Sequence, residues 1–104
     1  MNTVTLNEYI IEGLGEIHSL IAHEIQSFFK RFPQRIAVLR KSNTEFIIQD
    51  KKIGVKEISY KYLIEQDSWQ LKVNKETYLL KDGRSKTVSK ISHEIIFIII
   101  NQNL

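Results

Sequence analysis

The sequence predicts an α+β domain in which a helix at each end of the chain packs on one face of an antiparallel β-sheet. Apolar residues recur every three or four positions near both ends, and they alternate with polar residues across residues 34–82. A period near 3.6 marks helices and a period of 2 marks strands, so the middle of the chain is read as consecutive strands. We expect one domain over residues 1–104: a long N-terminal helix, a meander of four to five strands, and a C-terminal helix on one sheet face.

The composition is that of an ordinary globular domain. Of 104 residues, 42% are hydrophobic and 26% charged, which excludes disordered and collagen-like classes. The chain has no cysteine, which excludes disulfides, thiol nucleophiles and cysteine-bound zinc. Residues 95–100 form the longest apolar run, far below the roughly 20 residues that span a bilayer. With no signal-peptide pattern at residues 1–9, we expect no membrane partner and a cytoplasmic location.

The first third of the chain has the pattern of one long amphipathic helix. Thr5 and Glu8 fit a capping box at its start, and Pro33 is expected to end it. Gly13 and Gly15 are poor helix formers that mark a kink or a close approach of another backbone. The apolar stripe comprises Ile10, Leu14, Ile17, Ile21, Ile25, Phe28 and Phe32.

Five short runs rich in β-branched and aromatic residues follow, and they predict an antiparallel meander. The runs are residues 35–41, 44–50, 55–65, 68–73 and 76–81. Two-residue turns at 66–67 and at 74–75 place large apolar side chains on the same face of both hairpins. The expected pairs are Ile64–Trp69, Tyr62–Leu71 and Tyr60–Val73 in the first hairpin, and Leu71–Tyr78 and Trp69–Leu80 in the second.

The last segment fits two structures, and a helix is favoured. Val88, Ile91, Ile95, Ile98 and Ile99 form a helical stripe that Ser85 could cap. Residues 95–100 alone have the β-branched composition of a buried strand. The pattern continues longer than strands usually do, which indicates a helix.

The histidines do not form a recognisable metal site. His23 and His93 are each followed by glutamate, but a zinc-protease helix needs a second histidine four residues on, where the chain has Ser27 and Phe97. A site using His18 as well would need the two helices side by side. We interpret all three as ordinary hydrogen-bonding residues and expect no metal and no cofactor.

The carboxylates of the first third have mainly structural interpretations. Glu8, Glu12 and Glu16 form a row on the polar side of the helix, which suits a solvated face better than a binding site for a cation or a basic partner. Glu24 falls within the apolar stripe. If it is buried it needs a basic partner from the sheet or His93, and a structural pair is favoured over a functional carboxylate.

No catalytic residues are expected. No serine lies in a Gly-x-Ser-x-Gly turn, and residues 13–15, Gly-Leu-Gly, are too short for a nucleotide-binding loop. Four glycines and one proline leave little loop in which an active site could lie. We therefore expect a protein that is not an enzyme.

The sheet face without large apolar residues is the candidate binding surface. The predicted register points Tyr60, Tyr62 and Trp69 to one face and Lys61 and Lys72 to the other, so aromatic and basic residues do not combine into a base-stacking surface. The polar face presents a flat, mixed-charge set of residues that suits a protein partner or plain solvation. The candidate partner-binding residues are Glu57, Lys61, Gln70 and Lys72, with Ser59 between them and Glu45 nearby.

The leading hypothesis is a small bacterial inhibitor of the immunity or antitoxin kind that neutralises a toxin by direct binding. Residues 34–64 carry seven basic and three acidic side chains, and the whole chain has a net charge of +3. A nucleic-acid-binding module that uses Lys51, Lys52 and Lys56 is therefore the runner-up. A third hypothesis is an assembly subunit, including a homodimer formed through a sheet edge or the Ile-rich end.

Overall fold

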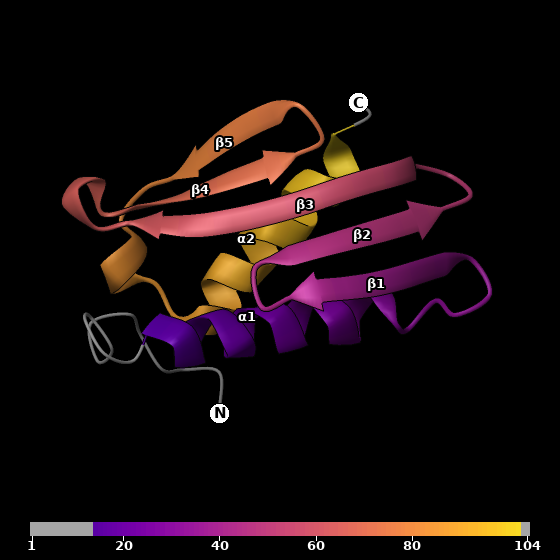
Figure 1. Ribbon diagram of the computed structural model, residues 1–104, viewed down its shortest axis with the longest axis horizontal. Helices are drawn as coiled ribbons and strands as arrows, with labels where there is room; N and C mark the ends of the chain where they lie inside the picture. Colours follow the sequence, from indigo (N-terminus) through magenta and orange to yellow (C-terminus); the bar gives the residue numbers. More distant parts are fainter. Residues whose placement is uncertain (1–13, 103–104) are drawn as a thin grey trace.

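A computed structural model describes residues 14–102 as a five-stranded antiparallel sheet with two helices (Figure 1). The strands lie in the sheet in chain order, β1-β2-β3-β4-β5, and each is antiparallel to the next. The predicted α+β class and the meander are confirmed. The elements are α1 (Leu14–Phe29), β1 (Ile36–Ser42), β2 (Glu45–Asp50), β3 (Gly54–Leu63), the 3-10 helix η2 (Ile64–Gln66), β4 (Ser68–Val73), β5 (Glu76–Leu80), the 3-10 helix η3 (Gly83–Ser85) and α2 (Val88–Asn101).

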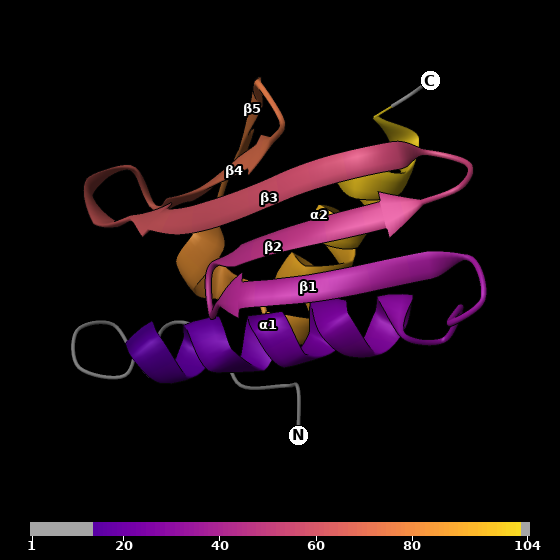
Figure 2. The same cartoon turned by 45° about the vertical axis from the view of Figure 1, so that its right-hand side comes forward.

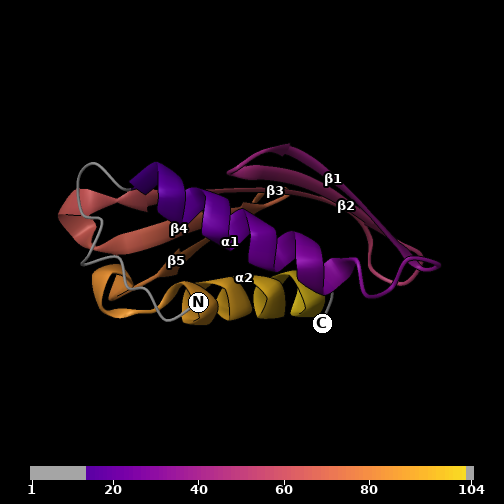
Figure 3. The same ribbon diagram turned by 90° about the horizontal axis from the view of Figure 1, so that it is seen from below.

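The molecule has two layers. In Figure 3, β1 and β2 arch above α1, α2 lies at the bottom of the view, and the two helices run in the same direction. The other face of the sheet carries no helix of the described residues. The sheet is twisted, and Figure 2 shows the β4–β5 hairpin turned well away from β1. An antiparallel sheet tolerates this one-sided cover because its two faces can differ in polarity.

The core lies between the helices and the inner sheet face. Trp69 is fully buried, and its ring contacts those of Tyr60, Tyr62 and His18 at centroid distances of 6.2, 5.3 and 5.6 Å. The predicted inward direction of the three sheet aromatics is confirmed by their burial. The helices contribute mainly isoleucines: Ile17, Ile21 and Ile25 from α1, and Ile91, Ile95, Ile96 and Ile99 from α2.

The first helix ends earlier than the sequence predicts. It stops at Phe29, and its last turn tightens through the bonds from Arg31 N to Phe28 O and from Phe32 N to Phe29 O. Pro33 keeps Phe32 out of helical geometry, so the chain turns here towards β1 and the Phe32 side chain is 39% exposed rather than part of the buried stripe. The predicted capping box, Ile10 and Gly13 lie outside the described residues.

The β3–β4 register differs from the prediction by two residues. The observed partners are Tyr62↔Trp69, Tyr60↔Leu71 and Ile58↔Val73. Residues 64–67 form a longer connection than the expected two-residue turn, in which η2 is followed by Asp67 at φ 48°. Because side chains alternate with period 2, a shift of two leaves every residue on its predicted face, but it exposes Ile64. The predicted β4–β5 pairs are confirmed.

The C-terminal segment is a helix, as favoured. Its N-cap is Thr87 rather than Ser85, and the Thr87 hydroxyl accepts a hydrogen bond from Lys90 N at 3.1 Å. The β-branched run is helical because Ile91, Ile95 and Ile99 recur at intervals of four and fill the core. Tertiary packing therefore outweighs the strand propensity of this run.

Gly83 holds the end of the sheet against the core. A Cβ atom at this position would lie 2.8 Å from Tyr62 Cε1 and 3.0 Å from Trp69 Cδ1. The Gly83 N–H also donates to Asp67 O at 2.9 Å. Glycine is required here by the close approach of the two rings.

We expect Gly83→Ala to lower the free energy of unfolding by about 1–3 kcal/mol, because the added methyl group overpacks the core. Gly15→Ala is the matched control, since nothing lies within 4 Å of its Cβ position. The control should be more stable by about 0.8–1 kcal/mol, the helix-propensity difference. Urea unfolding of both variants measures this, and equal stabilities would contradict the packing argument.

Candidate functional site

The outward face, which is the sheet surface turned away from the helices, brings the predicted binding residues together. Glu45 pairs with Ser59, and Ser59 pairs with Lys72, so these three lie in one row across β2, β3 and β4. Lys61 pairs with Gln70 in the adjacent row. Glu57 occupies the same face two residues before Ser59. The alternation of each strand is enough to gather all five predicted residues on one surface.

Two shallow hollows cover this group. One has a volume of about 160 Å³ and includes Glu45, Glu57 and Lys72 in its lining. The other has about 260 Å³ and is lined in part by Lys61 and Gln70. Pockets that bind small organic ligands usually have about 300–1,000 Å³. The surface therefore suits contact with another macromolecule better than capture of a small molecule.

The charged groups of the outward face do not neutralise one another. The ion pairs among residues 14–102 join Arg35 to Asp50, Arg84 to Asp67, and Lys86 and Lys90 to Glu94. None of these pairs includes Glu57, Lys61 or Lys72. Carboxylates and ammonium groups in one patch, without ion partners in the described chain, can form ion pairs with a complementary surface.

An apolar border to this patch was missed by sequence reasoning. Leu39 is 58% exposed and pairs with the half-buried Ile47, while Val55 and Leu79 are 54% and 50% exposed. They lie on the outward face of β1, β2, β3 and β5. Alternation along the strands could have revealed these apolar residues, because it places them on the same sheet face as the predicted charged residues. The outward face thus has a charged middle and an apolar border, the reverse of the usual interface, in which polar residues surround an apolar centre.

A turn residue stabilises the β3 side of the patch. Asn74, with φ 56°, accepts a hydrogen bond from Glu57 N through Oδ1 at 2.9 Å and donates its own N–H to Glu57 O at 2.8 Å. Asparagine tolerates this left-handed backbone better than most residues. The backbone at Glu57 is therefore held in place although no strand pairs with it on the β4 side.

Lys56 is not available on the outward face. It is only 4% exposed and points towards the helices, as its place two residues before the buried Ile58 requires. Lys56 is therefore not accessible to nucleic acid, whereas the other two lysines of that hypothesis, Lys51 and Lys52, are exposed in the β2–β3 turn. Tyr60, Tyr62 and Trp69 are buried and offer no ring to a base.

The other residues singled out in the sequence do not assemble into a site. Glu16 is exposed and Glu24 is half-buried on α1, whereas Glu8 and Glu12 lie outside the described residues. His23 and His93 are both exposed, one on each helix. Within residues 14–102, no three His, Asp or Glu side chains are placed to hold a metal ion.

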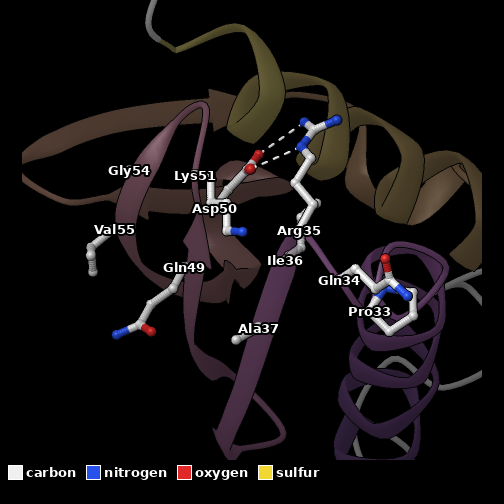
Figure 4. A pocket seen from close by; sticks show the side chains of 10 residues that line it. All are labelled: Pro33, Gln34, Arg35, Ile36, Ala37, Gln49, Asp50, Lys51, Gly54 and Val55. Atoms are coloured by element: carbon white, nitrogen blue, oxygen red, sulfur yellow. Dashed lines mark hydrogen bonds and ion pairs between the residues drawn. The ribbon is translucent and has the colours of Figure 1, made fainter.

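A hollow of about 540 Å³ lies where β1 and β2 meet the turn after α1 (Figure 4). The guanidinium of Arg35 donates two hydrogen bonds of 2.9 Å to the carboxylate of Asp50, and Figure 4 shows it directed at that group. The hydrogen bonds from Arg35 hold the pKa of Asp50 below its ordinary value. The pair links the residue before β1 to the last residue of β2, and we interpret its role as holding these two strands together.

His18 is the histidine that enters the core. Its Nε2 atom is buried without a hydrogen-bond partner, and the indole Nε1 of the adjacent Trp69 is likewise unpartnered. Burial lowers the pKa of His18 from its ordinary value of 6.5, because the charged imidazolium loses its hydration there. His18 is therefore a neutral core residue at pH 7 rather than a ligand or a general base in an open cleft.

We expect the stability of the protein to fall as the pH drops below 6.5 towards the lower folded-state pKa of His18. The unfolded chain binds a proton on His18 in this window while the folded chain does not, so protonation favours unfolding. His18→Phe keeps a ring in the core and should remove this part of the pH dependence. The exposed His23→Phe should retain it; chemical denaturation across about pH 5–7 is the measurement.

Within residues 14–102, neither α1 nor α2 has the length and apolar content needed to cross a membrane. Comparison of the chain with protein-family models, with curated proteins and with solved structures found no match in any of the three. The function is therefore argued from the outward face itself.

Proposed function

We propose that this chain is a non-enzymatic protein-binding module that docks a partner protein on its outward face. The observation that carries the proposal is the group of oppositely charged side chains, Glu57, Lys61 and Lys72, without ion partners among the described residues, on a sheet face that neither helix covers and that exposed leucine and valine border. Burying the border would contribute apolar free energy, and the charges would set orientation and specificity.

Within this class we propose an inhibitor of the immunity or antitoxin kind, which would neutralise its partner by covering that partner's working surface. A rigid sheet suits this role because it binds without ordering a flexible loop. The mixed charge of the patch would favour a partner surface with both signs. Nucleic-acid binding through Lys51 and Lys52 is the alternative that the same experiments can reveal.

Charge reversal on the outward face tests the proposal. The tagged chain is recovered from its own host in low salt, and the intact complex is weighed by native mass spectrometry. We expect a discrete protein partner whose affinity falls about tenfold or more for Lys61→Glu and for Glu57→Lys. Lys30→Glu, on the exposed turn after α1, makes the same charge change away from the face and should bind normally.

Unchanged affinity in both outward-face variants, with a normal circular dichroism spectrum, would contradict the proposed surface. Recovery of nucleic acid that leaves with nuclease or salt would contradict a protein partner and favour the alternative. The inhibitor role has its own readout. The purified partner should lose activity when the wild-type chain is added in equimolar amount and keep it with Lys61→Glu.

A further inference from the structure

The two edges of the sheet are built differently. At the β1 edge the register shifts between Arg40 and Ser42, which marks a bulge. Arg40 points inward, where its guanidinium donates hydrogen bonds to Gln26 and Asn43. A bulge and an inward charge are features by which proteins prevent an edge strand from pairing with another chain. The β1 edge is thus protected.

The β5 edge has no bulge, and its one charged residue, Glu76, lies at the end beside the β4–β5 turn. Its five residues pair with β4 without a register shift, and none of them is proline, lysine or arginine. A two-residue turn separates Val73 from Glu76, and hydrogen bonding alternates along an antiparallel ladder from that point. The N–H groups of Thr77 and Leu79 therefore face away from β4. They form a row of donors for a further strand.

An apolar groove lies beside this edge, which no other strand of residues 14–102 covers. It has a volume of about 340 Å³ and runs between Leu80, at the end of β5, and α2. Phe97 lines the groove and is 67% exposed, the most exposed large apolar side chain in the described chain. Ile98 contributes to the floor, and Lys90, His93 and Glu94 form its polar rim. An unpaired strand edge and an exposed aromatic ring thus occur on the same side.

We propose that a second copy of this chain covers the β5 edge and the groove, through antiparallel pairing of β5 with β5 about a two-fold axis. The surface complements itself in shape, because it presents both a protruding ring, Phe97, and the hollow that such a ring could fill. On the rim, Glu94 is paired with Lys86 at 2.9 Å and with Lys90 at 4.0 Å within one chain, so a second copy can cover it without leaving its carboxylate unpaired.

This pairing has a structural consequence. A two-fold axis perpendicular to the sheet joins the two sheets edge to edge and keeps all helices on one side. The two outward faces then form one continuous surface and present the proposed partner site twice. The dimer does not rest on the proposed function, since it uses β5 and α2 rather than the charged middle of the outward face.

Sedimentation velocity of the full chain over a wide range of concentration tests the dimer. We expect the mass to rise from 12.2 kDa to twice that value as concentration increases. Phe97→Asp removes the ring, and Thr77→Pro removes an edge donor while leaving the β4 ladder intact. Each should raise the dissociation constant of the dimer by about tenfold or more.

Leu39→Asp is the control, because Leu39 is an apolar residue of similar exposure that lies at the β1 edge. This variant should leave the dissociation constant of the dimer unchanged. A monomer at every concentration would overturn the proposal. So would a dimer whose dissociation constant is unchanged in both Phe97→Asp and Thr77→Pro. Lys61→Glu should remain dimeric even where it fails to bind the partner, so the two proposals fail separately.

Discussion

The contact of Gly83 with the rings of Tyr62 and Trp69 connects the two layers of this domain, and much of the structure depends on it. Trp69 is fully buried on the inner sheet face, and the segment that leads into α2 can approach it only because residue 83 has no side chain. The carboxylate of Asp67 secures this approach, because it accepts hydrogen bonds from the Tyr62 hydroxyl at 2.6 Å and from Arg84 N at 2.7 Å. With this corner held, α2 continues along the same sheet face as α1.

Covering only one sheet face separates the residues that fold the chain from those proposed to bind. The buried aromatics and isoleucines lie on the inner face, and the helices exclude water from them. The outward face contributes little buried apolar area, so charged residues such as Glu57 and Lys61 can occupy it without a desolvation cost. Their ionic groups keep their hydration until another surface displaces it. This division explains how the middle of the sheet can carry charges that have no ion partners among residues 14–102.

Two kinds of electrostatic environment act on the fold. Asp50 is bound by Arg35 and has a lowered pKa, so its stabilising effect is present above its ordinary pKa and is lost as the pH falls below it. His18 is buried as a neutral group and favours the folded state only while it remains unprotonated. The histidine contribution is lost at higher pH than that of the carboxylate, so acid weakens the α1–sheet contact before it weakens the pair that closes β1 and β2.

The sequence by itself determined the fold class, the order of helices and strands, and the sheet face on which each strand residue lies. It also determined which residues make up the candidate site. Which face of the sheet a side chain occupies is a local property, because side chains alternate along each strand. This is why Glu45 and Gln70 could be assigned to the same face from the sequence. The tertiary structure decided the length of the β3–β4 connection, in which Asp67 O accepts the Gly83 N–H, and the close approach of Gly83 to the rings of Tyr62 and Trp69. Each of these depends on contacts between segments far apart in the chain, which no local pattern contains. The same reason explains why the free β5 edge and the exposed Phe97 are seen to lie together only when α2 is placed under the sheet.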